Sequence, residues 1–506
     1  MKYGAIAGGE KSTVQAAFNI MENGGNAFDA AVGAVFTSMV SEYCLTGPGG
    51  GGAFLASPVN AEPILFDFFV DTPHPQPEKE LDFFSIIVDF GPSQQQFHIG
   101  QGSVAIPGNI AGLLKVHQRL GQIPLKAVLE PAVNAARDGI VLNSSQGYLI
   151  KILEPILTHS NGGKVLFSPN GKLLKKDDRF KNPRFADLLE ILVAEGHMYF
   201  YEKDGAELIL NTVGEKGLLT KEGLALYRVA ERVPLKSDFR GKTIYTNPAP
   251  SAGGTLITFV LQLLERSKTG TKSELIDLIR AMQITSSARR EISIDMNNEF
   301  QISQLLEPRT FSHYLRLFDS GSTPSQNEKD PVSRGATTHV SVIDKHGNAA
   351  SVTTTNGEGC GYIIPELGMM LNNMLGEEDL NPMGFHQWAH QRRLPTMISP
   401  TIVMGEKGVE LVLGSGGSNR LRSAISQVIL NLFAKKMDLE AAVHTSRIHL
   451  EGNVLHYEPG TILERSMDDI RLHPWDENNL FFGGVNAVSP SEAIGDPRRG
   501  GTGMIR

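Results

Sequence analysis

The stretch from Ala336 to Thr355 reads ATTHVSVIDKHGNAASVTTT and decides the fold class. Polar and apolar residues alternate in residues 338–344, and again in the β-branched run 349–355, which is the pattern of two half-buried strands. Residues 345–348, Lys-His-Gly-Asn, have the composition of a tight turn. The two strands are therefore predicted to pair as an antiparallel hairpin, with Thr337 at its entrance.

The residues just before this hairpin have a different composition. The tract Asp319 to Arg334, DSGSTPSQNEKDPVSR, is rich in Ser, Pro, Asn and charge, so we expect a mobile surface segment and a boundary there. The small residue Ala336 separates this tract from Thr337. A threonine at such a junction can be a nucleophile if the chain is cut before it, because the freed α-amine, with a pKa of about 7.7 to 8.0, can accept the hydroxyl proton.

The cluster Thr353-Thr354-Thr355 lies at the end of the partner strand and can supply a second hydroxyl to orient the first. A small residue before the threonine, a flexible tract upstream and a second hydroxyl are the features that such a site needs. By itself this pattern favours an ordinary Thr-rich hairpin that has no chemical role, because threonine is common in strands.

The first third of the chain mixes helices and strands. Two short helices are predicted in Gln15 to Val40, on either side of Gly24-Gly25-Asn26, and the glycine run from Gly47 to Gly52 predicts a loop. Alternating segments follow at Phe54 to Ala56 and Pro63 to Val70. A long helical tract is then predicted from Ile110 to Ile156.

The rest of the chain continues this mixture. Residues 160–235 are charged and helix-rich, and the turn-rich loop Asn247 to Gly254 opens a predicted helix at Thr255 to Glu265. Beyond the hairpin we expect strands at Pro400 to Met404 and Val409 to Leu413, and a helix at Arg420 to Ala434. An α+β protein without internal repeats is therefore predicted.

Composition excludes several classes of function. The chain has 506 residues, is 41% hydrophobic and carries a net charge of −8 without a basic, aromatic stripe, so nucleic acid is not an expected partner. Cys44 and Cys360 offer neither a disulfide framework nor metal-ligand spacing; we expect both to be buried, and we expect no metal or cofactor. The N-terminus shows no signal peptide or membrane span, so a cytoplasmic protein is predicted.

Several motifs together resemble the γ-glutamyltransferase family of N-terminal-nucleophile hydrolases. The segment from Thr337 to Val342, followed by Asp344, Gly347-Asn348-Ala349 and Ser351-Val352-Thr353, is similar to the signature that opens the family's small subunit. Further family motifs occur in the family's order at Gly24 to Ala27, Asp29 to Ala31, Gly49 to Gly52, Val104 to Gly108, Glu130 to Ala132, Pro250 to Gly254, Leu371 to Asn373, Ser399 to Thr401 and Asp496 to Gly500.

This resemblance implies a four-layer αββα sandwich and autocatalytic cleavage into residues 1–336 and 337–506, two fragments that remain together as one catalytic heterodimer. It implies Thr337 as the nucleophile and Thr355 as the supporting hydroxyl. The glycine-rich end Gly414 to Ser418 resembles the family loop that binds the oxyanion through backbone N–H groups, here those of Gly416 and Gly417. The family's proline between Ser415 and Gly416 is missing.

The implied substrate is a γ-glutamyl or related small amide, with water, an amine or a peptide as acceptor. Glu377 corresponds by count to the family's acidic residue after Leu371-Asn372-Asn373, and Glu358 lies near the residue that follows the second threonine. Since that stretch is about two residues short, Asn356 is an alternative to Glu358. Asn373 and Thr396 complete the expected substrate-binding set.

The resemblance fails where the family holds the donor's carboxylate. Phe69 occupies the position of the family's arginine, and Thr396 and Met397 replace its two adjacent serines. Arg392, Arg393 or Arg420 is a hypothetical replacement for that arginine. The natural acyl donor, the balance between hydrolysis and transfer, and the oligomeric state therefore stay open.

Three alternatives remain beside this interpretation. One is an amidohydrolase or acylase for a non-glutamyl acyl donor, and a second is a binding protein of the same fold without turnover. A third is a nucleotide-binding protein, suggested by Gly8-Gly9-Glu10-Lys11-Ser12. A phosphate loop, however, needs glycine where Glu10 stands, and the carboxylate adds the wrong charge.

Overall fold

The computed structural model describes residues 1–75, 78–89, 94–267, 274–293, 301–322, 336–381, 383–462 and 470–506. The predicted hairpin forms with the expected bounds: β11 (Thr338–Asp344) and β12 (Ala349–Thr355) pair antiparallel, with Thr338 opposite Thr354. Every residue of both strands is buried, because the hairpin lies in the middle of a larger sheet.

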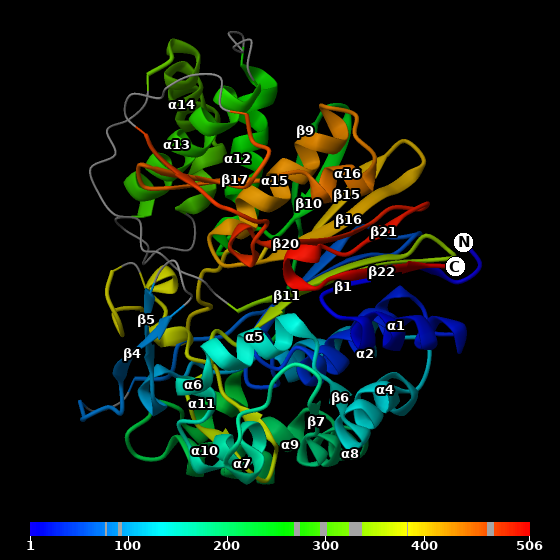
Figure 1. Cartoon of the computed structure of the whole chain (residues 1–506), viewed down its shortest axis with the longest axis vertical. Helices are drawn as coiled ribbons and strands as arrows, with labels where there is room; N and C mark the ends of the chain where they lie inside the picture. The colour runs from blue at the N-terminus through cyan, green and yellow to red at the C-terminus, as the bar shows by residue number, and fades with distance from the viewer. Residues whose placement is uncertain are drawn as a thin grey trace.

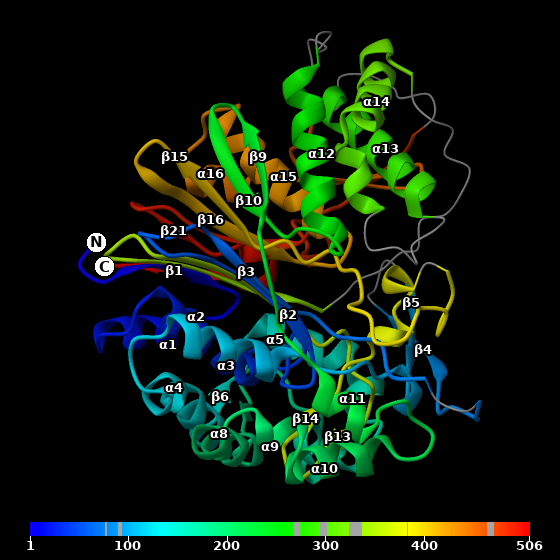
Figure 2. The same cartoon turned by 180° about the vertical axis from the view of Figure 1, so that it is seen from behind.

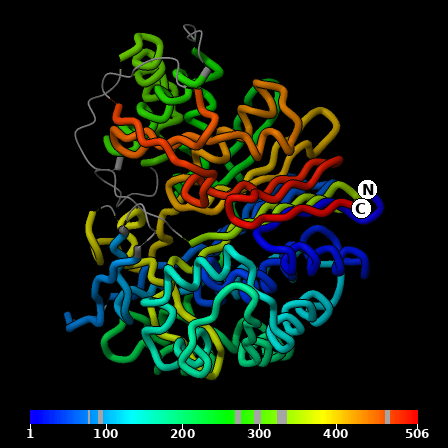
Figure 3. The backbone as a smooth tube through the Cα atoms, in the orientation of Figure 1, coloured from blue at the N-terminus to red at the C-terminus, as the bar shows by residue number. Residues whose placement is uncertain are grey.

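This larger sheet has seven strands in the described residues, and every neighbouring pair is antiparallel. The strands are, in spatial order, β22 (Thr502–Ile505), β1 (Gly4–Gly8), β11, β12, β2 (Gly51–Ser57), β3 (Ile64–Phe68) and β8 (Ala230–Arg232). The first and last strands of the chain are therefore neighbours, and Figure 3 shows the two termini together at one end of the sheet.

A second, six-stranded antiparallel sheet faces the first. Its strands are, in order, β21 (Ala493–Ile494), β20 (Gly484–Val488), β16 (Gly408–Gly416), β15 (Thr401–Gly405), β10 (Lys242–Thr246) and β9 (Leu235–Phe239). The two sheets pack through an apolar layer that includes Ala7, Leu55 and Ile343 from one sheet and Ile402 and Val412 from the other.

Helices cover the outer face of each sheet (Figures 1 and 2). The seven-stranded sheet is covered by helices of the first half of the chain: α1 (Lys11–Glu22), α2 (Ala27–Ser41), α3 (Asn109–Leu120), α4 (Leu125–Asp138), α5 (Ser144–Ile152), α6 (Glu154–Leu157), α7 (Asn161–Phe167), α8 (Pro183–Glu195), α9 (Met198–Tyr201), α10 (Asp204–Val213) and α11 (Lys221–Leu226). The other sheet is covered by α12 (Ala252–Arg266), α15 (Arg420–Phe433) and α16 (Leu439–His444), with α13 (Glu274–Ser293) and α14 (Pro308–Ser320) packed beside them.

Smaller elements complete the described chain: β4 (Phe84–Asp89) with β5 (Gln94–Ile99), β6 (Ile140–Val141) with β7 (Arg179–Phe180), β13 (Ile363–Ile364) with β14 (Met369–Met370), and the three strands β17 (Ile448–Glu451), β18 (Val454–Tyr457) and β19 (Arg471–Pro474). The architecture is the predicted four-layer αββα sandwich of the α+β class. None of the described helices is both long enough and apolar enough to cross a bilayer.

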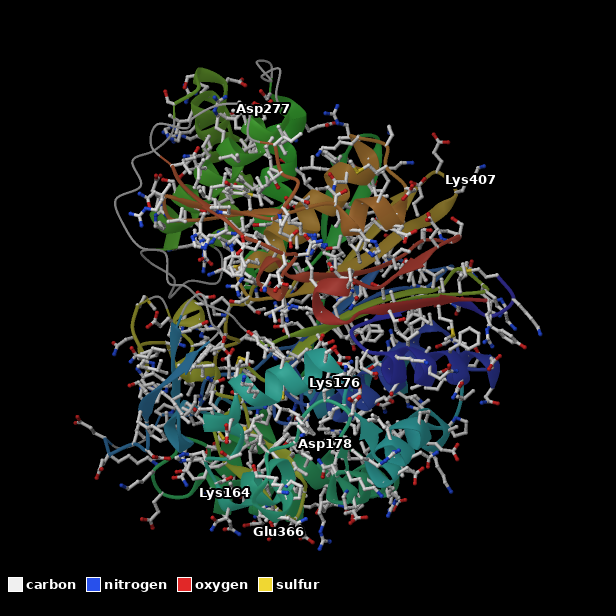
Figure 4. All side chains as sticks on the ribbon, viewed as in Figure 1. Lys164, Lys176, Asp178, Asp277, Glu366 and Lys407 are labelled. Carbon is white, nitrogen blue, oxygen red and sulfur yellow. The ribbon has the colours of Figure 1, made fainter. Side chains whose placement is uncertain are left out.

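Charged side chains of both signs occupy the outer surface. Lys164, Lys176, Glu366 and Lys407 are all exposed, and Figure 4 shows them projecting from the outside of the sandwich. The helix α2, by contrast, is buried along its whole length, because small residues such as Ala30, Ala31 and Ala34 let its neighbours approach closely.

Some sequence predictions need correction. The helical tract predicted from Ile110 to Ile156 is divided into α3 to α6, because Pro124 begins α4 and Gly139, at φ +80°, ends it. The helix predicted from Thr255 begins at Ala252, and the loop predicted to reach Gly52 gives way to β2 at Gly51. Asp319 and Ser320 are not part of a loop but close α14, and residues 323–334 of the predicted surface segment lie outside the described residues.

Cys44 was also predicted to be buried, but it is partly exposed, whereas Cys360 is buried as expected. The nucleotide-binding alternative finds no support at its motif. The residues Gly8 to Ser12 do join a strand to a helix, yet Glu10 caps α1 itself by accepting a hydrogen bond from the Ser12 N–H at 2.5 Å. A carboxylate thus occupies the place that a phosphate would need.

Asp344, at the end of β11, joins the hairpin to α2. Its buried carboxylate accepts hydrogen bonds from the N–H groups of Ala27, His346 and Asn348 at 3.0, 2.9 and 3.0 Å, and from the Asn348 side-chain amide at 2.8 Å. It therefore closes the hairpin turn and caps the N-terminus of a helix more than 300 positions earlier in the sequence.

Replacing Asp344 by alanine is expected to lower the free energy of unfolding by about 3 kcal/mol or more, because four donors lose a charged acceptor and three of them are backbone groups. Urea unfolding followed by circular dichroism measures the loss. Asp187→Ala is the matched control, since Asp187 is a surface carboxylate paired only with exposed arginines, and its removal should cost less than about 1 kcal/mol. Equal losses in the two variants would contradict the role given to Asp344.

Candidate active site

Thr337 lies where β11 begins, between the two sheets, and is 4% exposed. Thr338 pairs with Thr354, so the residue before it, Thr337, lies beside the residue after Thr354, which is Thr355. Ala336 remains joined to Thr337 and is also buried. The hairpin therefore brings together the two threonines that the sequence singled out.

The Thr355 hydroxyl has a defined direction. It accepts a hydrogen bond from the N–H of Gly357 at 3.0 Å and donates its own proton to the carbonyl oxygen of Ala336. That carbonyl belongs to the peptide bond between Ala336 and Thr337. A donor in this position stabilises negative charge on the oxygen, which is the charge that develops when a nucleophile attacks the carbonyl carbon.

The glycine-rich end of β16 comes very close to Thr337. A Cβ atom built on Gly416 would lie 2.2 Å from the Thr337 carbonyl oxygen, and one on Gly414 would lie 2.3 Å from the His339 ring. Gly417 has a φ of +123°, which side-chain-bearing residues rarely adopt. Glycine is therefore required here for β16 to reach β11. Gly416 lies beside Thr337, and Gly417 is the next residue.

His339 connects the strands behind Thr337 and is neutral. Burial lowers its pKa to about 3. Its Nδ1 and Nε2 lie 2.7 Å from the Thr353 hydroxyl and 2.8 Å from the Ser341 hydroxyl. Since Ser341 donates its proton to the Asn486 carbonyl at 3.0 Å, Nε2 carries the ring proton and Nδ1 accepts from Thr353. This histidine organises the interior and is not available as a base.

Acidic side chains line the other side of Thr355. Glu358 accepts a hydrogen bond from the Ala336 N–H at 3.3 Å, and the Asn373 side-chain oxygen accepts from the Glu358 N–H at 3.0 Å. Glu377 approaches the same turn, because a Cβ atom on Gly357 would lie 2.2 Å from its Oε1 and 2.1 Å from the Asn373 Oδ1. Glu358, Asn373 and Glu377 are thus brought together next to the two threonines.

Two oxygens of this acidic group have no partner among the described residues: Glu358 Oε2 and Glu377 Oε1 are buried without a hydrogen bond. Burial raises the pKa of Glu358 to about 8, and repulsion from Asp379 adds to the effect. Burial likewise holds the pKa of Glu377 well above its usual range, with repulsion from Glu358 and Asp379. Near neutral pH the group therefore retains protons, which a bound cation would displace.

Asp379 is a member of this group that the sequence analysis did not assign. It accepts hydrogen bonds from Ser418 Oγ at 2.5 Å and from the Asn419 amide at 2.9 Å, so it ties the acidic loop to the glycine-rich end of β16. Its position directly after Glu377-Glu378 was the only signal in the sequence. Asn356, the alternative to Glu358, instead donates to the Met370 carbonyl at 3.3 Å.

Thr396 is placed by contacts with α12. Its hydroxyl accepts from the Ile398 N–H at 3.2 Å, and its carbonyl oxygen accepts from the Ala252 N–H at 2.9 Å and from the Ser251 hydroxyl at 2.8 Å. Among the residues that the structure describes, no hydrogen bond joins Thr396 to Thr337. Its proposed contact with substrate therefore rests on the sequence alone.

Arg393, one of the hypothetical carboxylate-binding residues, is already engaged. It donates to the Phe69 carbonyl and to the Tyr227 hydroxyl at 2.6 Å, and its Nε lies 3.1 Å from Asp71 Oδ1 and 3.7 Å from Asp67 Oδ1. Two carboxylates thus neutralise its charge. Phe69 itself is 1% exposed and packs in the apolar layer between the sheets.

The other two arginines are no better placed. Arg392 is exposed, and its backbone N–H donates to the Thr72 hydroxyl at 2.9 Å. Arg420 is fully buried, donates to the Phe481 carbonyl at 3.1 Å and lies 3.6 Å from Glu451. No direct replacement for the missing arginine is therefore evident among these three residues.

Two charged residues that sequence reasoning missed lie on the opposite side of Thr337. Arg499 donates to the Thr337 carbonyl oxygen at 3.4 Å, and Glu42 accepts from the Thr338 hydroxyl at 2.5 Å. Arg499 belongs to the quoted motif Asp496 to Gly500 but had been given no role, and nothing in the local sequence marks Glu42. Within the described part of the chain, no group of three or more His, Cys, Asp and Glu side chains is arranged to hold a metal ion.

Comparison with known proteins agrees with this architecture. The family model described as gamma-glutamyltranspeptidase matches residues 13–505. The glutathione hydrolase proenzyme of Pseudomonas aeruginosa is 26% identical over 543 residues, covering 99% of this chain and 94% of that protein. The acylase ACY 1 proenzyme of a Pseudomonas species is 28% identical over 485 residues, covering 93% of this chain and 87% of that protein.

The solved structures show the same fold. The cephalosporin acylase of Bacillus halodurans superposes with a TM-score of 0.82 at 19% identity, covering 99% of this chain and 96% of that one. Because the family model spans nearly the whole chain and relatives align over nearly all of it, the chain belongs to the gamma-glutamyltranspeptidase family and is an enzyme of the N-terminal-nucleophile hydrolase type.

Proposed function

We propose that the protein cuts itself between Ala336 and Thr337, and that Thr337 then transfers acyl groups from small amides to water or to an amine. The observation that carries this proposal is the hydrogen bond from the Thr355 hydroxyl to the Ala336 carbonyl oxygen. It polarises the bond to be cut, and Thr337 is the next residue. Two relatives are named as proenzymes, a glutathione hydrolase proenzyme and an acylase proenzyme, and this supports a processed enzyme.

Self-cleavage needs no group beyond these residues. The Thr337 hydroxyl oxygen attacks the Ala336 carbonyl carbon, and its proton passes to the Thr337 nitrogen as the C–N bond breaks. The product is an ester between Ala336 and the Thr337 side chain. Water then hydrolyses this ester, which leaves a carboxylate on Ala336 and a free hydroxyl and amine on Thr337.

The same hydroxyl then serves turnover. The freed amine takes the hydroxyl proton while the oxygen attacks the substrate amide, and the leaving amine departs with that proton. The acyl-threonine ester is hydrolysed by water or attacked by an acceptor amine or peptide. Backbone N–H groups of Gly416 and Gly417 are proposed to hold the oxyanion, a role supported by the closeness of Gly416 to Thr337.

The two fragments, 1–336 and 337–506, are proposed to stay together as a heterodimer. In the seven-stranded sheet β11 and β12 belong to the smaller fragment and lie between β1 and β2 of the larger one. Separating the fragments would expose the buried faces of these strands and break the hydrogen bonds on both sides. The catalytic unit therefore requires both fragments.

The acidic group beside Thr355 supports an acyl donor with an ammonium group. Within the part of the chain that the structure describes, Glu358 and Glu377 each present a buried oxygen without a hydrogen-bond partner, and Asn373 holds the turn between them. We propose that Glu358, Glu377, Asn373 and Thr396 bind the donor. A γ-glutamyl amide of the glutathione type carries the ammonium group that such a site would hold.

A second candidate is an acylase for a non-glutamyl donor. A specific observation favours it: Phe69 fills the apolar layer, and Arg393, bound to the carbonyl of Phe69, is neutralised by Asp67 and Asp71. Neither residue can bind a substrate carboxylate as a free guanidinium group would. A donor panel with and without an α-carboxylate distinguishes the two candidates.

Freshly made protein is expected to convert from one chain to fragments of residues 1–336 and 337–506, and Thr337→Ala should remain a single chain. Thr355→Val should slow this conversion by about 100-fold or more, because it removes the donor from the Ala336 carbonyl while keeping the side-chain volume. Intact-mass spectrometry over a time course measures both rates.

Thr354→Val is the matched control for Thr355→Val. Thr354 is the adjacent buried threonine on β12, and its hydroxyl bonds to Thr46 rather than to Ala336. Its variant should be cut at nearly the normal rate. Equal slowing in the Thr354 and Thr355 variants, or cleavage of Thr337→Ala at the same bond, would contradict the proposed mechanism.

Donor binding is expected to strengthen as pH rises toward the Glu358 pKa of about 8. The sign follows because an ammonium ion binds the ionised carboxylates, so binding must displace their protons, and fewer protons remain at higher pH. KM for a donor with an ammonium group should therefore fall from pH 6 to pH 8. KM for the same donor without its amine should change much less.

Glu377→Gln is expected to raise the KM of the amine-bearing donor by about 10- to 100-fold at pH 8, because it removes one of the two charged acceptors. Glu378→Gln is the matched control, since Glu378 is the next residue but is exposed. The assignment fails if the two variants behave alike, or if KM of the amine-bearing donor is flat across this pH range.

A further inference from the structure

Arg499 reaches the nucleophile from the side opposite the acidic group. Its Nη1 donates to the Thr337 carbonyl oxygen at 3.4 Å, and its Nη2 donates to the Leu480 carbonyl oxygen at 3.3 Å. A Cβ atom on Gly416 would lie 3.1 Å from Nη1, and one on Gly484 would lie 2.6 Å from the Arg499 Cδ. Glycines on two strands thus leave the space that the guanidinium occupies.

The charge of Arg499 is not neutralised by a contact ion pair. Among the described residues it has no carboxylate within 4.0 Å, and its Nε is buried without a hydrogen bond. The nearby Asp496 is paired with Arg447 at 2.6 Å and with Arg498 at 3.3 Å. Burial, with repulsion from Arg420, lowers the pKa of Arg499 to about 10, so it stays charged at neutral pH.

The Thr337 nitrogen lies within reach of this charge. Three bonds separate it from the carbonyl oxygen that Arg499 holds, so it is at most about 7 Å from Nη1. A cation at this distance, in a buried site, disfavours a second positive charge. Once cleavage frees the amine, Arg499 therefore acts against its protonation.

Other charges surround the same residue. Glu42, directly after α2, accepts hydrogen bonds from the hydroxyls of Thr338 and Thr13 at 2.5 and 3.1 Å. Burial raises the pKa of Glu42 to about 7, and repulsion from Glu10 adds to this effect. On the loop after β12 and beyond, Glu358, Glu377 and Asp379 form the acidic group, in which the two glutamates hold protons near neutral pH. Arg420, at the start of α15, is paired with Glu451.

We propose that Arg499 is a positioning residue for the nucleophile: its guanidinium fixes the Thr337 carbonyl, and its charge keeps the freed Thr337 amine neutral and able to act as the base. Glu42 opposes this effect from the other side. The inference rests on the proposed function, because only a cleaved chain has this amine. It adds a group that sets the pH range in which the nucleophile works.

The test is the acid limb of the kcat/KM profile for a donor without an ammonium group, because this limb reports the pKa of the free enzyme's base without the ionisation of Glu358 and Glu377 that an ammonium donor requires. Activity rises with pH as the amine loses its proton, so removing a nearby cation should raise the amine pKa and move the limb to higher pH. Arg499→Gln should shift the limb upward by about one pH unit, whereas Arg499→Lys, which keeps the charge, should leave it nearly in place.

Glu42→Gln supplies a variant with the opposite sign. It keeps an acceptor for the Thr338 hydroxyl but removes the negative charge, so the limb should move to lower pH. The shift should be smaller than that of Arg499→Gln, because Glu42 is only partly ionised near its pKa of about 7. A merely structural role for either residue would change the rate without producing limbs that move in opposite directions.

Competitive labelling with acetic anhydride, read on the peptide that begins at Thr337, gives the amine pKa without turnover. If Arg499→Gln is not cleaved, labelling of Arg499→Lys and Glu42→Gln decides. The proposal requires an amine pKa that is unchanged in Arg499→Lys and lowered in Glu42→Gln, and any other combination overturns it. In cleaved Arg499→Gln, an amine pKa equal to that of the unmodified protein also overturns it. If the unmodified protein never yields the fragment 337–506, the proposed function itself is wrong.

Discussion

The antiparallel register of β11 and β12 is the constraint on which the site depends. It fixes Thr338 opposite Thr354 and so brings Thr337 beside Thr355, whose hydroxyl donates to the carbonyl oxygen of the peptide bond between Ala336 and Thr337. A slip by one residue would turn every side chain of β12 to the other face of the sheet. The buried sandwich around the hairpin, together with the Asp344 carboxylate that closes its turn, stabilises this register.

Charge is distributed unevenly around Thr337, the proposed nucleophile. Three acidic side chains lie on the side of Thr355, whereas Arg499 lies on the side of β16 and Glu42 lies beyond Thr338. His339, the imidazole nearest to Thr337 in the sequence, is neutral and bonded on both nitrogens, so it cannot serve as the base. This arrangement suits a nucleophile that supplies its own amine as the base.

The hairpin and its neighbours could be predicted because their signals are local. The alternation over residues 338–355 predicted both strands with the bounds that the structure shows. The order of the short motifs indicated the family and its layered fold. Glu358, Glu377 and Asn373 could be expected in one substrate-binding set because the family resemblance implied it. The break of the predicted long helix at Gly139 was missed, since helical periodicity continues on both sides of it.

Arg499 and Glu42 could not be found in this way. Arg499 is 162 positions from Thr337, and Glu42 is 296 positions from Thr338, so their contacts arise only when the ends of the chain meet in one sandwich. The ion pairs of Arg393 could not be predicted for the same reason, because its partners Asp67 and Asp71 lie far from it in the sequence. The hairpin pattern and the family resemblance singled out Thr337 but not the charges that surround it.

The central claim is that the hydroxyl of Thr337, freed at its amine, carries the acyl group. It is tested most directly by mixing the active protein with a slowly hydrolysed amide donor, quenching in acid within one turnover and mapping the adduct by tandem mass spectrometry. The account predicts the mass of the acyl group on the first residue of a peptide that begins Thr337-Thr338-His339. An adduct on any other side chain, or rapid turnover by a chain still intact at Ala336, would contradict it.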